Sequence, residues 1–190
     1  MVAVAVVIPI EKFVQPYAGD VAWLPPMTLL FIAWAFIEEI TKFLAAYVTV
    51  LRRAEDDEPI DPVIYMVTTA LGFAAAENTL FLLSPLAGST VFQTLITGNL
   101  RFVGATLLHV LSSAVIGLAL ALAFYAKRNV KRRYAFIGVL FAGIVHSIFN
   151  FFIINTAEEH LLRTFAFVWV GIIVLLAVLE FVKRIKPRWT

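Results

Sequence analysis

The sequence predicts an all-α fold: a polytopic membrane helix bundle of about five transmembrane helices, forming a single integral-membrane domain over residues 1–190. Composition is the first observation. Of the 190 residues, 62% are hydrophobic and only 15% are charged, whereas soluble domains are about half apolar and about a quarter charged. The second observation is a series of five apolar runs. Each is long enough for a bilayer crossing of about 20 residues, and none alternates with the period-two pattern of barrel strands.

The five apolar runs are separated by short polar segments, and no soluble domain or long linker interrupts them. The second run has helix-boundary signals at both ends, Asp61-Pro62 before it and Ser84-Pro85 after it. The runs cover about residues 24–51, 62–84, 101–126, 134–155 and 163–182.

Two further apolar stretches are too short to cross a bilayer. Residues 85–100 are expected either to lie along the outer interface or to dip into it, as a short interfacial or re-entrant helix. Residues 1–10 lack a basic region and a small-residue cleavage site, which argues against a cleaved signal peptide. We expect this N-terminal stretch to lie at the interface.

Basic residues predict the orientation, because Lys and Arg concentrate in cytoplasmic loops. Two basic residues in 52–53, five in 127–133 and four in 183–188 fall on one side of a five-pass arrangement. The other side has Lys12 and Arg163. The N-terminus is therefore expected outside and the C-terminus in the cytoplasm, with the lipid bilayer as a partner.

The composition and motifs exclude several classes of site. The chain has no cysteine, so it has no disulfide, thiolate nucleophile or cysteine metal site. Its net charge is only +2 and its basic residues cluster in the loops, which indicates no nucleic-acid partner. Gly-x-Ser-x-Gly, Gly-x-Gly-Asp and His-Glu-x-x-His motifs are absent, so serine-hydrolase, aspartyl and zincin sites of those types are set aside.

The first run is unusual because Glu38, Glu39 and Lys42 interrupt its apolar sequence. A charged side chain at the bilayer centre costs roughly 2.5–3.5 kcal/mol, so three on one helix cost on the order of 8–10 kcal/mol before any pairing. Other helices must therefore supply partners. Three of the remaining runs carry polar groups away from their ends: Glu77 with Asn78, His109 with Ser112 and Ser113, and His146 with Asn150.

These polar groups are predicted to meet at one level of the membrane. Counted inward from the outer ends of their runs, Glu38, Glu77, His109 and His146 lie roughly 10–20 Å below the outer boundary, at about 1.5 Å per residue. A lone histidine or asparagine in a membrane often only joins neighbouring helices, and the two serines of the third run are interpreted as packing residues or backbone hydrogen bonders. Three glutamates and two histidines at matched depth instead indicate one buried polar pocket in the outer half of the membrane.

The residue types in this pocket suit general-base activation of water. We expect Lys42 to neutralise one of Glu38 and Glu39 and to leave the other free to take a proton; the residues alone do not decide which. A histidine with a nearby asparagine amide supplies donors for a tetrahedral oxyanion. The pattern predicts metal-free peptide hydrolysis inside the bilayer, with no cofactor.

Four motifs follow one another on successive runs: Glu38-Glu39-x-x-Lys42, Phe73-x-x-x-Glu77, His109-x-x-x-Ser113 and His146-x-x-x-Asn150. In this order they resemble the motifs of the PrsW family of intramembrane proteases. That family is related to the CAAX prenyl endopeptidase and Abi proteins and to the Aph subunit of gamma-secretase. The lysine spacing and Glu77 favour the PrsW branch. The resemblance covers about residues 24–155, which are the core motif helices.

The resemblance implies a glutamate-dependent endopeptidase in a bacterial or archaeal cell membrane. Its substrate would be a membrane-anchored protein, such as an anti-sigma factor, cut at an extracytoplasmic site. The roles carried over by motif are Glu38 as general base, Glu39 and Lys42 as its orienting partners, Glu77 and His109 as the groups that position the water, and His146 and Asn150 as oxyanion donors.

Two alternatives remain open, and the oligomeric state is not predicted. A zinc-dependent protease like the CAAX/Abi proteins would use Glu38, Glu77, His109 and His146 as ligands, since histidine and carboxylate suit zinc. A non-catalytic membrane scaffold like the Aph subunit would keep the polar core for helix packing and partner binding. A proton-coupled transporter is disfavoured, because the chain shows no inverted repeat and no broken helix.

Overall fold

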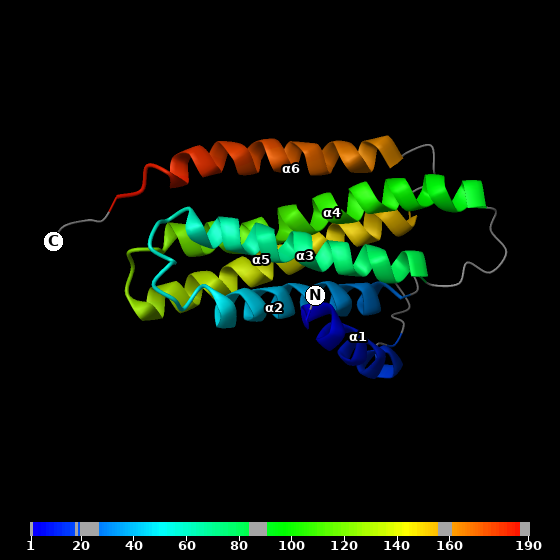
Figure 1. The fold of residues 1–190 in the computed structure, drawn as a ribbon, viewed down its shortest axis with the longest axis horizontal. Coiled ribbons are helices and arrows are strands. Elements are labelled where there is room, and N and C mark those ends of the chain that lie inside the picture. Colours follow the sequence, from blue (N-terminus) through cyan, green and yellow to red (C-terminus); the bar gives the residue numbers. More distant parts are fainter. Residues whose placement is uncertain (1, 18, 20–26, 84–90, 156–160, 187–190) are drawn as a thin grey trace.

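A computed structural model describes residues 2–17, 19, 27–83, 91–155 and 161–186. Side chains are described for these residues except 2, 81–83, 91–102, 153–155, 161–165 and 167. Within these ranges every regular element is a helix, which confirms the all-α fold class. The longer helices run lengthwise as one bundle (Figure 1).

The described part of the chain contains six α-helices and one short 3-10 turn. In chain order they are α1 (Val2–Val14), η1 (Gln15–Tyr17), α2 (Thr28–Thr49), α3 (Asp61–Leu83), α4 (Val91–Leu122), α5 (Arg128–Asn155) and α6 (Leu161–Val182). Helices α2 to α6 correspond to the five predicted apolar runs, in the predicted order. Pro62 lies in the first turn of α3, where its missing N–H breaks no helical hydrogen bond.

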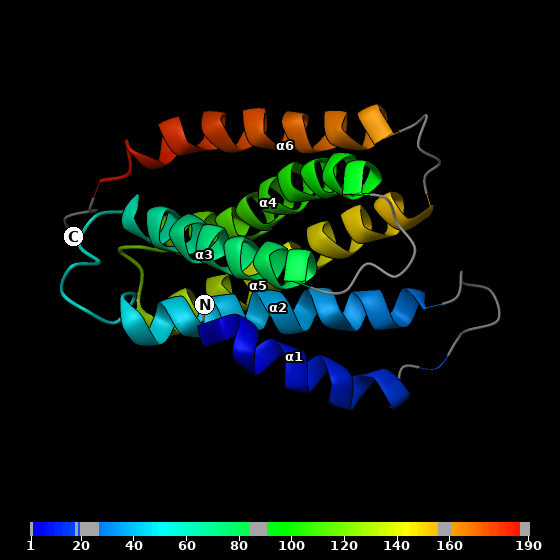
Figure 2. The same ribbon diagram turned by 45° about the vertical axis from the view of Figure 1, so that its right-hand side comes forward.

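Helix α4 lies at the centre of the bundle. It packs against α3, α5 and α6, while α2 packs mainly against α5. Figure 2 shows α6 along one side of α4, on the far side of the bundle from α2. The α3–α4 contact is very close at Gly117, where an added Cβ would lie 2.6 Å from the Cα of Val63 and 2.9 Å from the carbonyl oxygen of Pro62. Small residues allow this close approach of helix backbones in membranes.

Two helix boundaries differ from the prediction. Residues 91–100 form the first turns of the continuous, 32-residue α4 and are not a separate interfacial or re-entrant helix. No proline interrupts this stretch, so the helix continues through it. Residues 84–90 lie outside the described residues. Helix α5 begins at Arg128 rather than near residue 134, because Lys and Arg are good helix formers and extend the helix beyond its apolar part.

The N-terminal stretch forms α1, which packs into the bundle. Its Ala3, Val4 and Val7 are buried against Phe73 and Ala76 of α3. Helix α1 also contacts α2 and lies beside it in both views (Figures 1 and 2). This stretch was expected to lie at the interface, but a short apolar segment does not specify which neighbour it will cover, so its contact with α2 and α3 could not be predicted.

Three helices of the described part are long and apolar enough to cross a membrane: Asp61–Leu80, Val103–Leu122 and Arg128–Phe152. Val168–Val182, within α6, is a shorter apolar helix. Helix α2 has 22 residues, a sufficient length, but it carries the three charged residues of the first motif. The bundle therefore has the composition of a polytopic membrane protein.

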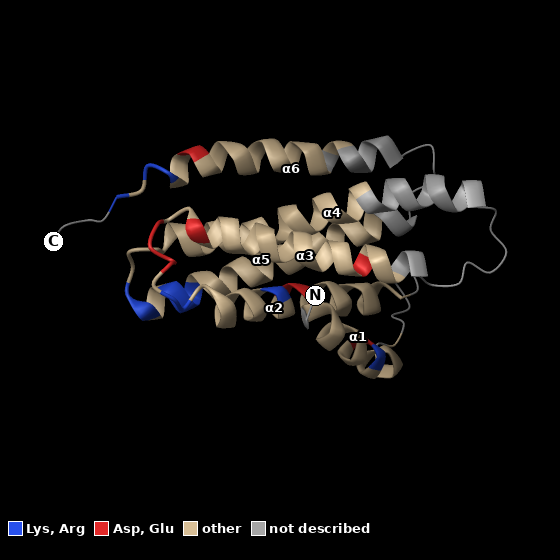
Figure 3. Ribbon diagram, viewed as in Figure 1, with Lys and Arg blue, Asp and Glu red and all other residues tan. Residues whose placement is uncertain are grey.

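Lys and Arg gather at one end of the bundle, where α5 begins and α6 ends (Figure 3). The connection between α2 and α3 lies at the same end (Figure 1). We call this the basic end, and the predicted orientation assigns it to the cytoplasm.

The tight α3–α4 contact can be tested with a glycine substitution. We expect Gly117→Ala to destabilise the bundle by about 1–3 kcal/mol, the usual cost of overpacking a close contact. The matched control is Gly72→Ala in α3, where an added Cβ meets nothing within 4 Å. Thermal unfolding in detergent measures both variants. An unchanged transition for Gly117→Ala would contradict the close helix approach.

Candidate functional site

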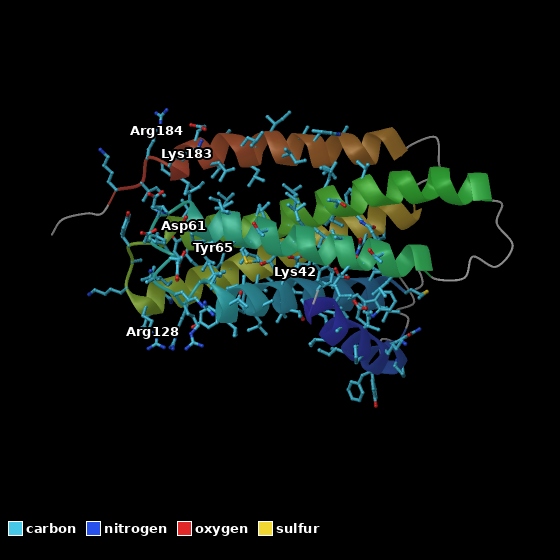
Figure 4. All side chains as sticks on the ribbon, in the orientation of Figure 1. Lys42, Asp61, Tyr65, Arg128, Lys183 and Arg184 are labelled. Atoms are coloured by element: carbon cyan, nitrogen blue, oxygen red, sulfur yellow. The ribbon has the colours of Figure 1, made fainter. Side chains whose placement is uncertain are left out.

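The charged groups of α2 lie on one stripe that faces the interior of the bundle. Glu38, Glu39 and Lys42 are 8%, 0% and 0% exposed. Lys42 Nζ lies 2.6 Å from Glu39 Oε1 and 3.9 Å from Glu38 Oε2. One ammonium group, one turn along the helix, therefore serves both carboxylates. Figure 4 labels Lys42 near the middle of the bundle.

Glu39 is held by hydrogen bonds from three helices. Ser112 and Ser113 of α4 each donate to one of its oxygens, at 2.8 Å. His146 Nδ1 of α5 lies 2.9 Å from Glu39 Oε1, and Lys42 binds the same oxygen. A buried carboxylate needs partners of this kind to offset its lost hydration. Glu39 is therefore the junction of α2, α4 and α5.

The partners of the two histidines fix their tautomers. An ammonium can only donate, so His109 Nδ1, 2.8 Å from Lys42 Nζ, is an acceptor. His109 Nε2–H then donates to Glu77 Oε2 at 2.7 Å. Glu39 accepts from His146 Nδ1–H, so in a neutral His146 the Nε2 atom is an acceptor. His109 is neutral in this arrangement, because its Nδ1 accepts from the ammonium.

Glu38 is the member of the cluster with unused hydrogen-bonding capacity. Its Oε2 is buried and has no hydrogen-bond partner in the described part of the chain. This oxygen lies 3.7 Å from His109 Nδ1 and 3.8 Å from His146 Nε2. His109 Nδ1 already accepts from Lys42, so Glu38 Oε2 and His146 Nε2 are the two facing atoms for which no hydrogen bond is described. A water between them could donate to both.

The structure brings most of the predicted site residues together but leaves one aside. Glu38, Glu39, Lys42, Glu77, His109 and His146 form one connected cluster. Asn150 lies one turn beyond His146 on α5 and makes no side-chain hydrogen bond to this cluster within the described residues. Glu77 is the accessible member, with a side chain 34% exposed against 11% for Glu38.

The sequence analysis did not identify Glu11 as a neighbour of the cluster. Helix α1 brings the Glu11 carboxyl within hydrogen-bonding reach of Glu38 and close to Glu77. The available signal was a lone acidic residue directly after an apolar run. Ser112 donates to the carbonyl oxygen of His109, as a backbone hydrogen bonder would. Ser112 and Ser113 also complete the partners of Glu39, which was not predicted.

The donor atoms of the cluster also match a metal site. One ligand atom from each of Glu38, His109 and His146 lies within 4.8 Å of the others. Two histidines, one carboxylate and an open position form a common ligand set of catalytic zinc. Glu77 and Glu39 bind the other nitrogen of each histidine, as carboxylates do beside zinc-bound histidines. The residue types present therefore suit zinc, although Lys42 would have to leave His109 Nδ1 before that nitrogen could bind an ion.

Comparison with known proteins identifies the family. A family model described as "PrsW family intramembrane metalloprotease" matches residues 1–179. A relative from Geobacillus kaustophilus (strain HTA426), described as "Protease PrsW", is 27% identical over 143 residues, which cover 75% of this chain and 59% of the relative. A "Protease PrsW" from Clostridioides difficile (strain 630) is 29% identical over 122 residues, 64% of this chain and 50% of the relative. A third, from Shouchella clausii (strain KSM-K16), is 22% identical over 151 residues, 80% of this chain and 66% of the relative.

The match has a defined extent. The chain spans between half and two thirds of the length of these relatives. No solved structure matches it significantly. The family match covers α1 and all four motif helices, and together with the apolar helices it identifies an integral, multi-pass membrane protein. The chain belongs to the PrsW family of intramembrane proteases.

Proposed function

We propose that this chain is an intramembrane endopeptidase that hydrolyses a peptide bond of a membrane-anchored protein with water activated by Glu38. The observation that carries the proposal is the buried Oε2 of Glu38, which has no hydrogen bond in the described part of the chain and faces imidazole nitrogens of His109 and His146 at 3.7 and 3.8 Å. A water in this space would donate one proton toward Glu38 and the other toward His146 Nε2. Its oxygen would then be free to attack the scissile carbonyl.

The hydrogen bonds favour Glu38 over Glu39 as the general base. Glu39 already accepts from Lys42, His146 and two serines, so its lone pairs are occupied. A general base needs a lone pair within hydrogen-bonding distance of the proton it removes. We therefore assign Glu39 and Lys42 as positioning residues. The proton taken by Glu38 then passes to the leaving amine as the carbon–nitrogen bond breaks.

The remaining groups divide the other tasks. Glu77 orients His109 through the 2.7 Å bond to Nε2. His146 Nε2 carries no proton in the tautomer described above, so it positions the water first and can donate to an oxyanion only after it has been protonated. Asn150, one turn further along α5, supplies an amide N–H donor for the oxyanion.

The location of the cluster supports the substrate class. Lys42 of the cluster lies near the middle of the bundle (Figure 4), away from the Lys and Arg residues of the basic end (Figure 3). The partly exposed Glu77 gives access to the cluster from the side of the bundle. The relatives described as "Protease PrsW" are bacterial, which favours a protein anchored in a bacterial cell membrane, such as an anti-sigma factor, as the substrate.

A zinc-dependent protease is the second candidate. The family description includes the word metalloprotease, and the donor set fits zinc. Glu38, His109 and His146 would hold the ion, which would supply a Lewis acid to polarise the carbonyl. We favour the metal-free form because Lys42 already donates to His109 Nδ1. That nitrogen has one lone pair and cannot also bind a metal.

Substitution of the proposed general base tests the proposed proteolytic activity. We expect Glu38→Gln and Glu77→Gln to insert and fold but to lose cleavage of a reconstituted single-pass substrate, since a general base contributes about 10²–10⁴-fold. Glu180→Gln is the matched control, because Glu180 is exposed near the end of α6 and pairs only with Lys183 there. Cleavage retained by both site variants would contradict the proposal.

The positioning role of Glu39 predicts a different effect. Glu39→Gln leaves Lys42 buried without its closest partner, so we expect a loss of about 3–5 kcal/mol in the free energy of unfolding. Glu38→Gln should unfold close to the wild-type temperature. Thermal unfolding of the two variants in the same detergent gives the comparison. Equal stability of both would refute the division of roles between the adjacent glutamates.

Metal analysis separates the two candidate mechanisms. We expect purified protein to contain much less than one zinc per chain and to cleave its substrate equally well after chelator treatment. Stoichiometric zinc, with cleavage lost in chelator and restored by zinc, would establish the zinc-dependent form. The Glu38→Gln result tests proteolysis itself and does not depend on this outcome.

A further inference from the structure

A cavity of about 660 Å³ lies between α2 and α5, on a face of α2 that the charged cluster does not use. Its walls are apolar and include Ile40 and Leu44 of α2 and Leu140 of α5. Leu44 is 50% exposed and Phe136, also in the wall, is 70% exposed. The cavity therefore opens at the side of the bundle. In a membrane, this side of a helix bundle faces lipid.

One end of the same cavity is strongly basic. Four basic residues line this end. One lies in the connection between α2 and α3 and three lie in the first turns of α5: Arg52, Arg128, Lys131 and Arg132. All four are exposed, and they lie at the basic end of the bundle (Figure 3; Arg128 is labelled in Figure 4).

Aromatic rings hold two of these cations near the cavity. The Arg52 guanidinium lies 5.6 Å from the ring centroid of Tyr47. Lys131 Nζ lies 5.0 Å from that of Phe124. Cation–π contacts keep such side chains in place without neutralising their charge. Both cations thus remain available to an anion.

The connection between α2 and α3 is also held at this end. The Tyr65 hydroxyl donates to the carbonyl oxygen of Glu55 at 2.7 Å, and Asp61 accepts from the N–H of Glu58 at 2.7 Å (Tyr65 and Asp61 are labelled in Figure 4). These bonds place Asp56 in the lining of the cavity.

Asp56 is an acidic group without a hydrogen-bond partner for one oxygen. Its Oδ1 is buried and unpartnered within the described residues. Burial, with the neighbouring charges of Asp61 and Asp57, raises the pKa of Asp56 to about 6 despite the opposing charge of Lys131. Asp56 therefore changes charge near neutral pH.

We propose that this cavity binds one anionic phospholipid from the leaflet at the basic end, with an acyl chain along the apolar walls and the phosphate among the four basic side chains. Basic pockets between membrane helices on the cytoplasmic side are suited to such headgroups. An apolar wall continuous with a cluster of cations matches the two chemically different halves of a lipid. The proposal concerns a site distinct from the glutamate–histidine cluster and does not rest on proteolysis.

A substrate helix is a poorer match for this cavity. An apolar transmembrane helix needs no group of four cations, and the cavity lining contains none of the glutamates and histidines of the cluster. A phospholipid uses both parts of the lining. If the protein bound zwitterionic and anionic lipids equally well, or bound neither, the assignment of an anionic phospholipid to this cavity would be contradicted.

The affinity of the proposed site for an anionic phospholipid should depend on pH. Above the pKa of Asp56 its carboxylate repels the lipid phosphate, and below it the protonated acid can donate a hydrogen bond to the phosphate. Asp61, Lys131 and Asp57 are the charged groups that act on Asp56, and Arg52, Arg128 and Arg132 are the other charged residues that line the cavity. Affinity is therefore expected to rise as the pH falls from about 8 to about 5, and Asp56→Asn should make it nearly independent of pH.

Native mass spectrometry of the delipidated full chain, titrated with phosphatidylglycerol or phosphatidylcholine in detergent, tests the proposal. We expect preferential retention of one phosphatidylglycerol. Each Lys or Arg near an anionic lipid contributes roughly fivefold in affinity, so the double variant Lys131→Gln, Arg132→Gln should bind roughly 25-fold more weakly. Leu140→Trp, which narrows the apolar wall, should also weaken binding.

The matched control is the double variant Lys127→Gln, Arg133→Gln, which removes the same charge from neighbouring positions that do not line the cavity. It should bind phosphatidylglycerol nearly as well as the wild type. If both double variants lost phosphatidylglycerol affinity equally, the lipid would be attracted to the basic end as a whole. That result would overturn the proposal of a specific site. All of these basic residues are exposed, so the charge variants should fold even if Leu140→Trp does not.

Discussion

The buried ion pair between Lys42 and Glu39 is the interaction on which the rest of the structure depends. Both side chains are fully buried, and their charged atoms are 2.6 Å apart. Neither charge could remain in a low-dielectric interior alone, because an unpaired buried ion costs several kcal/mol. The carboxylate also requires Ser112, Ser113 and His146, so satisfying it fixes α4 and α5 against α2.

Two adjacent glutamates acquire different roles because successive residues on a helix point about 100° apart. Glu39 faces α4 and α5 and is saturated with hydrogen bonds. Glu38 faces α1 and the two histidines and keeps one oxygen unpartnered. Helix α2 thus carries two different carboxylates. The oxygens of Glu39 are occupied by hydrogen bonds, whereas Glu38 Oε2 has none within the described residues.

Helix α2 also separates two environments of the bundle. Its charged stripe faces inward, whereas Ile40, Leu44 and Tyr47 line the cavity next to α5 and end near the basic side chains. A lipid in that cavity would contact the outer surface of the helix that carries Glu38, the proposed general base. The inward face of α2 therefore carries the ion pair and the polar cluster, and its outer face lines the proposed lipid site.

The sequence by itself determined the all-α membrane bundle, the order of its five long helices and most of the groups that meet in the polar cluster, although not Asn150, which makes no hydrogen bond to it within the described residues. Composition, apolar run length and the fixed rise of a helix are local properties that can be read from the chain. Only the tertiary structure distinguished Glu38 from Glu39, joined Ser112 and Ser113 to the cluster and brought Glu11 of α1 to Glu38. It also showed that residues 91–100 continue α4. Those outcomes depend on how each helix is rotated and which neighbour covers it, and contacts between distant segments, not local spacing, decide both.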